Sequence, residues 1–279
     1  MLINRRIIDS NFTPQYNIGL TIKVINAGLE QAILAGIGPD ISDMTTTNAI
    51  TWGLRTAVEK LNDTNDPSVG FEGFDEACED IDPAALKTCT LYGVTYALPK
   101  TMDFPMMFYR TDILSELGVD VPKTWDDLLA LIPILQFNNM EIGMTQNYQI
   151  FMYQMGEELW ADDGMRINLD SNKSLEAFQT MSNMFTQYSL SVDYDFANRF
   201  RTGEMPIAIR NYTEYNNVVI FATEIAGLWE FGPVPGMVQE DGSIKNTSMS
   251  STSALVIMSG AKDIESAWEF MKWYTDSKF

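Results

Sequence analysis

The segment from Tyr96 to Ile132, YALPKTMDFPMMFYRTDILSELGVDVPKTWDDLLALI, constrains the fold more than any other part of the chain. A short apolar strand ends at Leu98-Pro99, and a second strand, PMMFYR, follows almost at once. Two helical patterns come next, so strands and helices alternate within a few dozen residues. This alternation is typical of α/β proteins, in which helices cover a sheet.

Local signals set the bounds of those two helices. Thr111 is a candidate cap for the first helix, and Gly118 is expected to end it. Thr124 is expected to cap the second helix. Pro133 lies within the pattern of the second helix, so we predict a kink there or a boundary between two helices.

The rest of the chain continues the same alternation. At the start, a strand, a helix, a short strand and a further helix predict a βαβ unit over a parallel sheet. Gly93 marks a hairpin turn. The predicted strands are 18–26, 40–44, 105–110, 205–211, 229–236 and 254–259, and the main predicted helices are 7–12, 29–36, 51–61, 172–190, 215–221 and 262–276.

Composition excludes several classes of function. The chain has 279 residues and is 46% hydrophobic, enough for one large domain or two smaller ones. Its 18 Lys and Arg against 38 Asp and Glu give a net charge of −20, which disfavours nucleic acid and anionic lipid. Because the sequence contains no histidine, it lacks the commonest general base and the commonest transition-metal ligand. Carboxylate chemistry remains open, and no cofactor motif such as GxGxxG or a P-loop is present.

The two cysteines bear on the redox compartment of the protein, and the hydropathy pattern bears on whether the chain spans a membrane. Cys78 and Cys89 are close in sequence, which favours a local disulfide in an oxidising compartment about equally with two free thiols. No apolar run approaches the roughly 20 residues of a membrane-spanning helix. We therefore expect a soluble chain.

Aromatic residues among polar ones suggest a ligand. Tyr148, Tyr212 and Tyr215 lie beside Asn, Gln, Thr and Glu near predicted strand ends. Many aromatics simply belong to a core. A flat ring next to hydrogen-bonding groups also suits a sugar, because the ring stacks on the apolar face of the sugar while its hydroxyls need donors and acceptors.

Charged and hydroxyl residues at strand ends are further candidates. Asp103 and Arg210 are either solvated loop charges or groups that bond to ligand hydroxyls. Asp43, Thr45 and Thr46 stand at the carboxyl end of a short predicted strand, where α/β sheets place their ligands. The alternative for the threonines is helix capping.

Five segments together resemble a known family. GIGPDI, YALP followed by MMFYRTDILSELGVDVPKTWDDL, FRTGEMPIAIRNYTEYN, WEFGPVPG and SAWEFMKWYTD occur in this order between Ile7 and Tyr274. The chain is similar in this respect to extracellular solute-binding proteins of the maltose and oligosaccharide type, the family 1 binding proteins of ABC importers. The resemblance covers nearly the whole chain.

This resemblance implies a two-lobed α/β fold of the type II periplasmic-binding-protein class, with crossing hinge strands that allow the lobes to close on a ligand. The first lobe would comprise residues 1–99 and 249–279, and the second residues 100–248. The opening segment would then be the crossing from the first lobe to the second. Ligand contacts implied by the family fall on Asp43, Thr45, Thr46, Asp103, Tyr148, Arg210, Tyr212, Tyr215 and Ser250.

The chain also departs from the family pattern. Many members have Asn where this chain has Arg110, and many have Trp where Tyr212 or Tyr215 stands, which leaves the identity of the ligand open. Family members usually carry further segments at both ends. We therefore expect a truncated chain or a domain of a larger surface protein, anchored to the membrane through a segment outside this sequence.

The expected function is capture of a carbohydrate, an oligosaccharide in particular, by an extracellular or periplasmic monomer that delivers it to the permease subunits of an ABC transporter. No enzymatic activity, cofactor or metal is expected. Three alternatives stay open at this point. They are a polyamine or other cationic solute as the ligand, a binding-fold module of a multidomain surface protein, and a glycoside hydrolase with a carboxylate pair.

Overall fold

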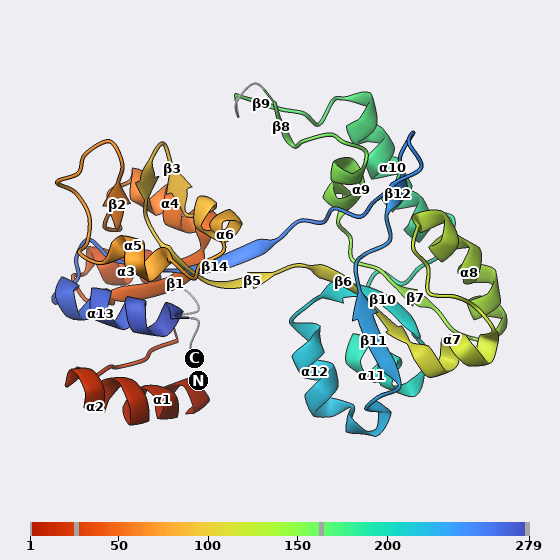
Figure 1. The fold of residues 1–279 in the computed structure, drawn as a ribbon, viewed down its shortest axis with the longest axis horizontal. Coiled ribbons are helices and arrows are strands. Elements are labelled where there is room, and N and C mark those ends of the chain that lie inside the picture. Colours follow the sequence, from red (N-terminus) through yellow and green to blue (C-terminus); the bar gives the residue numbers. More distant parts are fainter. Residues whose placement is uncertain (1, 25–27, 162–164, 277–279) are drawn as a thin grey trace. The chain divides into compact units, whose positions relative to one another are not determined.

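The computed structural model describes residues 2–24, 28–161 and 165–276. The chain forms two compact units, one made of residues 1–102 with 251–279 and the other of residues 103–250. It therefore leaves the first unit after Met102 and returns to it after Ser250. Figure 1 labels the elements of both units.

The first unit contains a three-stranded sheet in the order β1-β14-β5 and a smaller sheet in the order β2-β4-β3. Strand β14 is antiparallel to β1, with Asp43 opposite Leu255. The elements of this unit are α1 (Leu2–Ile7), the π-helical η1 (Ile8–Phe12), α2 (Thr13–Tyr16), α3 (Leu29–Leu34), β1 (Ile41–Thr45), α4 (Thr46–Leu54), β2 (Asn62–Asp63), α5 (Phe74–Cys78), α6 (Pro83–Lys87), β3 (Thr90–Leu91), β4 (Val94–Thr95), β5 (Leu98–Asp103), β14 (Ser251–Ile257) and α13 (Ile264–Thr275).

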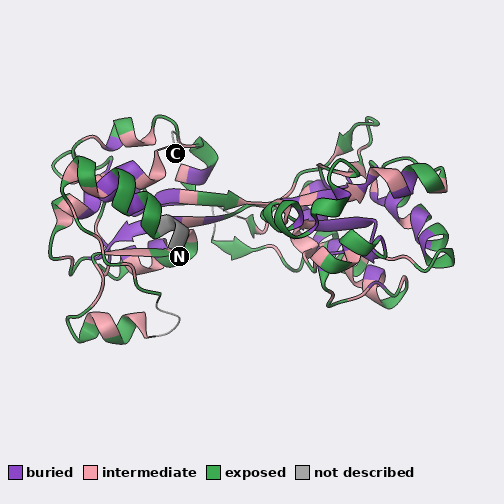
Figure 2. Ribbon diagram, turned by 90° about the horizontal axis from the view of Figure 1, so that it is seen from below, coloured by how far each residue is buried: buried purple, intermediate pink, exposed green. Residues whose placement is uncertain are grey.

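Strand β14 is the centre of the first unit because it is buried on both faces. Ala254 and Val256 belong to a cluster with Ala49 of α4, whereas Leu255 and Ile257 belong to another with Trp268 of α13 and its neighbours. Alternate residues of a strand point to opposite faces, so a continuous apolar run is what such a strand requires. Most residues of β14 are buried, and buried residues are purple in Figure 2.

Three predictions for the first unit are wrong. Of the predicted strand 18–26, residues 18–24 are irregular and residues 25–26 lie outside the described residues, although Ile18, Leu20 and Ile22 still pack against a cluster around Phe12. The side chains of this segment therefore alternate between half-buried and exposed although the segment pairs with no strand in the described part of the chain. The predicted parallel βαβ unit does not form here. The predicted helix 51–61 begins earlier and stops at Leu54, shortly before Thr56 takes a positive φ of 58°.

The second unit is built on a four-stranded sheet in the order β11-β6-β10-β7. Strand β6 is antiparallel to both β11 and β10, and β10 is parallel to β7. The elements are β6 (Pro105–Arg110), α7 (Thr111–Leu117), α8 (Trp125–Phe137), β7 (Ile142–Gly143), α9 (Tyr148–Gln154), β8 (Trp160–Ala161), β9 (Arg166–Ile167), α10 (Asn172–Thr186), α11 (Phe196–Thr202), β10 (Ile207–Asn211), α12 (Glu214–Phe221), the 3-10 helix η3 (Thr223–Ile225), β11 (Trp229–Gly232), β12 (Met237–Val238) and β13 (Ile244–Lys245).

The helix signals of the second unit are partly confirmed. Thr124 forms a capping box with Asp127, and Gly118 ends α7 in the left-handed conformation at φ 66°. Thr111, however, is the first residue of α7 rather than its cap. Helix α8 continues through Pro133 as one element, so the boundary predicted there is wrong and the alternative, a kink, stays a prediction. A proline costs the helix one backbone bond, and the buried face of α8 outweighs that loss.

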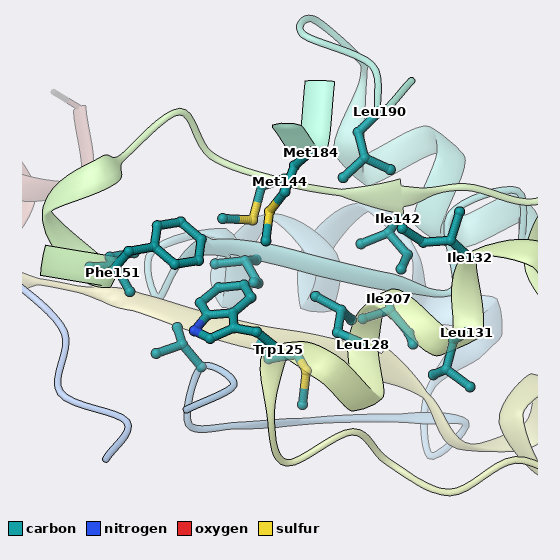
Figure 3. Packing of buried hydrophobic residues seen from close by; sticks show 14 of the residues in the cluster. Trp125, Leu128, Leu131, Ile132, Ile142, Met144, Phe151, Met184, Leu190 and Ile207 are labelled. Carbon is teal, nitrogen blue, oxygen red and sulfur yellow. The ribbon is translucent and has the colours of Figure 1, made fainter. Parts of the chain in front are cut away.

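Helices cover both faces of this sheet. On one face, Ile207 and Ile209 of β10 pack in a cluster with α8, α9 and α10, part of which Figure 3 shows. Trp125 and Phe151 lie side by side in it, with ring centroids 4.4 Å apart. On the other face, Ala208 and Phe108 pack against α11 and α12. The end of the sheet where β6 begins and β10 ends is thereby packed on both faces.

The disulfide hypothesis is wrong for this structure, because Cys78 and Cys89 are both free thiols. Cys89 is buried with Val94 and Ala97, whereas Cys78 packs against a separate cluster that contains Trp268. Burial raises the pKa of Cys78 to about 11 and that of Cys89 to about 12.

We therefore expect both thiols to react slowly with iodoacetamide at pH 8 in the native protein, since thiolate is the reactive form. In urea without reductant, two thiols per chain should alkylate rapidly. Mass spectrometry of the alkylated chain counts them. If no thiol reacted in urea until a reductant was added, the two cysteines would be bonded after all.

Candidate functional site

The candidate site lies in the second unit, where β10 ends beside the start of β6. The antiparallel register pairs Asn211 with Pro105, and this pairing continues beyond the strands. The backbone N–H of Tyr212 donates to the carbonyl of Phe104 over 2.8 Å. One residue further, the N–H of Thr213 donates to the Asp103 side chain over 3.1 Å. The two segments are therefore held together as far as Asp103.

Aromatic rings line this end of the ladder. Tyr212 is nearly parallel to Phe104, with centroids 5.5 Å apart and 5° between the planes, and to Tyr215 at 5.9 Å and 15°. Phe231 of β11 packs on both tyrosines at 5.5 and 5.6 Å. Tyr212 remains 36% exposed, so the row of rings Phe104, Tyr212 and Tyr215, called the aromatic row below, reaches solvent.

Asp103 makes four hydrogen bonds within the protein. One carboxylate oxygen accepts from the backbone N–H groups of Phe104 and Thr213. The other accepts from the Asn211 side-chain amide and the Thr213 hydroxyl, both over 3.0 Å. Asp103 is thus bonded to both neighbours of Tyr212 in the chain, and the hydrogen bonds that its carboxylate accepts come from the protein.

Arg210 is also engaged within the protein. Its guanidinium forms an ion pair with Glu214 over 2.8 Å and lies 5.5 Å from the Tyr194 ring centroid and 5.7 Å from that of Phe196. The pKa of the Tyr194 phenol is raised, because burial disfavours the phenolate more than the neighbouring Arg210 favours it. Arg210 therefore supports the base of α12, which carries Tyr215.

The remaining predicted residues of the second unit, Tyr148 and Ser250, lie on other segments than the aromatic row. Tyr148 is the first residue of α9, which Asn147 caps, and its ring meets Phe178 of α10 edge to face with centroids 6.2 Å apart. Ser250 is exposed and is the last residue of the second unit. Their roles in ligand binding stay predictions.

Asp43, Thr45 and Thr46 belong to the first unit. Asp43 of β1 forms an ion pair with Lys100 of β5, on the far side of β14 in the sheet. Thr45 caps α4 by accepting from the N–H of Asn48 over 3.3 Å, and Thr46 is the first residue of that helix. The capping alternative for Thr45 is thereby confirmed, and ligand binding by these three residues stays a prediction.

A pocket of about 430 Å³ adjoins the aromatic row in the second unit. Its walls come from α12, η3 and β11 and include Tyr215, Trp229 and Phe231, with Glu230 at one side. Another pocket of about 410 Å³ lies at the opposite edge of the same sheet, between α8 and β7, and none of the predicted residues lines it.

Sequence reasoning missed three residues of the site. Phe104 stacks on Tyr212, and Asn211 and Thr213 bond to Asp103. Each of them flanks a residue that the sequence did single out. The signal was the antiparallel pairing of the segments 103–105 and 211–213, which becomes visible only once the two strands are known to be neighbours.

The chemistry of this site favours binding over catalysis. Stacked rings offer flat apolar surfaces, and nearby amides and hydroxyls offer hydrogen bonds. Among the described residues, no group of three or more His, Cys, Asp or Glu side chains is placed to hold a metal ion. Within the same ranges, none of the helices is both long enough and apolar enough to span a bilayer.

Comparison with known proteins agrees with this picture. A family model described as bacterial extracellular solute-binding protein matches residues 10–278. A curated relative, the maltotriose-binding protein of Pyrococcus abyssi (strain GE5 / Orsay), is 24% identical over 257 residues. The match covers 88% of this chain and 53% of that protein, so this chain spans about half the length of that relative.

Solved structures of similar fold cover nearly the whole chain. A solute-binding protein from Thermotoga lettingae TMO, bound with alpha-D-tagatose, has a TM-score of 0.77 at 22% identity over 98% of this chain and 73% of that one. The sugar-binding protein MalE from Xanthomonas citri has a TM-score of 0.77 at 18% identity, over 99% and 72%. The GacH receptor of Streptomyces glaucescens, solved unliganded and with acarbose, has 0.78 at 17%, over 99% and 73%. The predicted fold class, a two-lobed α/β solute-binding fold, is confirmed.

Proposed function

Since this chain belongs to the family of bacterial extracellular solute-binding proteins, we propose that it binds a neutral carbohydrate, and an oligosaccharide in particular. The observation that carries the proposal is the aromatic row beside hydrogen-bonding side chains at one end of the β6/β10 ladder. Sugar rings have apolar faces that stack on aromatic rings, and their hydroxyls need polar partners. Tyr212 and Tyr215 are the residues proposed to make the stacking contact.

The similar proteins support a carbohydrate as the ligand. The curated relative is a maltotriose-binding protein, and the solved structures of similar fold include complexes with alpha-D-tagatose, acarbose and maltotetraose. We propose that the two units of this chain are the two lobes of the family fold. Transfer of the ligand to ABC permease subunits, a monomeric state and anchoring near the membrane are further parts of this proposal.

Two of the alternatives that the sequence left open have less support than a carbohydrate ligand. Catalysis by a carboxylate pair has no support in a family of solute-binding proteins. A cationic ligand such as a polyamine has one supporting observation, the net charge of −20. The aromatic row does not separate these ligands by itself, because rings also attract cations. A titration must separate them.

The test is isothermal titration calorimetry with a panel of maltose, maltotriose, maltotetraose, tagatose, acarbose and spermidine. We expect an oligosaccharide to bind and spermidine not to bind. Replacing Tyr212 with alanine should weaken that binding by about 2 kcal/mol, or about thirtyfold, the usual loss for an aromatic residue at the centre of an interface. Tyr215→Ala should have a similar effect.

Tyr92→Ala serves as the matched control, because Tyr92 is 86% exposed at the turn of a hairpin in the first unit. Its affinity for the oligosaccharide should equal that of the unmodified protein. Binding of spermidine alone would replace the carbohydrate proposal with the cationic one. Oligosaccharide binding that both tyrosine variants retained in full would move the site away from the aromatic row.

A further inference from the structure

The bonds of Asp103 fill the acceptor capacity of its carboxylate. A carboxylate offers about four acceptor positions, two on each oxygen. One oxygen of Asp103 accepts two backbone N–H groups, from Phe104 and Thr213. The other accepts two side-chain donors, from Asn211 and Thr213. Little acceptor capacity remains for a hydroxyl of a ligand.

These bonds reach the residues on both sides of Tyr212 and the residue on which its ring stacks. Asn211 and Thr213 flank Tyr212 in the chain, and Phe104 stacks on its ring at 5.5 Å. The N–H of Tyr212 itself donates to the carbonyl of Phe104. Asp103 therefore links the backbone that carries the Phe104 ring to the turn that carries the Tyr212 ring.

We propose that Asp103 is a positioning residue, which fixes the Tyr212 ring in the aromatic row and makes no direct contact with the ligand. The proposal rests on the proposed function insofar as the ligand is a carbohydrate. Ordering a side chain or a turn during binding weakens affinity, whereas a ring that is already fixed avoids this cost. Without the Asp103 bonds, the segment after β10 would have to become ordered when the ligand binds.

The interaction between Asp103 and Asn211 can be tested by exchanging its donor and acceptor. In Asp103→Asn, two amide groups face each other and the acceptor for the Asn211 NH2 group is weakened. In Asn211→Asp, two carboxylates face each other. The double variant restores one amide and one carboxylate with their positions exchanged, and the Thr213 hydroxyl can rotate to suit. Asp120→Asn, in the exposed loop between α7 and α8, is the control for loss of one negative charge.

Two measurements are made on each variant. The first uses ligand-free protein and follows the near-UV circular dichroism of the aromatic rings together with hydrogen exchange of the Thr213 amide. Each single variant should change the spectrum and speed exchange, and the double variant should restore both. The second is the affinity for the oligosaccharide that binds the unmodified protein. It should fall about tenfold in each single variant and recover in the double variant, as expected for a coupled pair.

The two measurements distinguish the possible failures. The proposal would be overturned by two results together. The affinity would stay low in the double variant, and the spectrum and amide exchange of ligand-free Asp103→Asn would equal those of the unmodified protein. Asp103 would then be a direct ligand contact. An unmodified protein that bound no carbohydrate would refute the proposed function alone. The ligand-free measurements would still decide whether Asp103 fixes Tyr212, since an unchanged spectrum and unchanged exchange in Asp103→Asn would refute that too.

Discussion

Replacing Phe108 with alanine should lower the free energy of unfolding by about 4 kcal/mol, the middle of the range for removal of a buried phenylalanine. Phe108 is fully buried in the middle of β6. Its ring has four aromatic neighbours, with centroid distances of 5.6 to 6.5 Å, which are Phe196, Phe200, Trp229 and Phe231. Rings of this size cannot collapse into the space left by the lost side chain, so a cavity remains.

Urea unfolding followed by tryptophan fluorescence measures this effect, because Trp229 lies in the same cluster. Phe137→Ala is the matched control, since Phe137 ends α8 with 89% of its surface exposed. Its unfolding free energy should change by less than about 0.5 kcal/mol. If Phe108→Ala lowered the free energy of unfolding by less than about 1 kcal/mol, the close packing of this aromatic cluster would be contradicted.

Replacing Arg110 with methionine should cost about 3 kcal/mol, the lower end of the range for breaking a buried ion pair. Arg110 is 7% exposed, and its guanidinium donates twice to the Asp112 carboxylate, over 2.8 and 2.6 Å. A third nitrogen donates to the carbonyls of Phe200 and Arg201 near the end of α11. Methionine fills similar space but removes the guanidinium's bonds to the carboxylate and to both carbonyls.

This effect should depend on pH. The pKa of Asp112 is held below its ordinary value, chiefly by the hydrogen bond from Arg110. A group with a lowered folded pKa stabilises the protein above its unfolded pKa, about 3.9 for aspartate, and loses this contribution as the pH falls through the folded value. Urea unfolding at pH 7 and at pH 3 should therefore show a smaller difference between Arg110→Met and the unmodified protein in acid.

The exposed pair of Arg5 and Asp9 provides the comparison. Arg5→Met should change the unfolding free energy by less than about 1 kcal/mol, because exposed ion pairs contribute little. Equal losses for Arg5→Met and Arg110→Met would contradict the role assigned to the buried guanidinium. Arg110, one of the departures from the family pattern, joins β6 to α11 through its bonds to the carbonyls of Phe200 and Arg201.

Much of the fold could be predicted because local signals and packing agree in the second unit. The strand Pro105–Arg110, the cap at Thr124 and the helix end at Gly118 all follow from residue patterns of short range. The segment 18–24 shows the limit of this reasoning. Its alternating apolar residues are half-buried, as on one side of a strand, yet among the described residues no strand pairs with this segment. Sequence periodicity does not report pairing.

The candidate site was predictable only in part, for a similar reason. Tyr212 and Tyr215 stand out as aromatics in polar surroundings, and the structure brings them together with a third ring. Asn211 and Thr213, which supply the other donors to Asp103 besides Phe104, lie more than one hundred positions away from it. Asp43 and Lys100 are 57 positions apart in the chain, whereas Arg210 forms its ion pair with Glu214 only four residues further on. Single residues suggest chemistry, but only the pairing of distant strands tells which of their bonds are already used.

The position of β14 has a consequence for how the chain is made. This strand lies in the middle of its sheet, yet it is translated after every other strand in the described ranges. On the ribosome, residues 103–250 emerge as one uninterrupted stretch and can reach their folded state first. Strands β1 and β5 cannot complete their sheet until β14, which lies between them, has been synthesised. The unit that begins first, with residues 1–102, is thus finished last. This reverses the usual order in which domains are completed during synthesis.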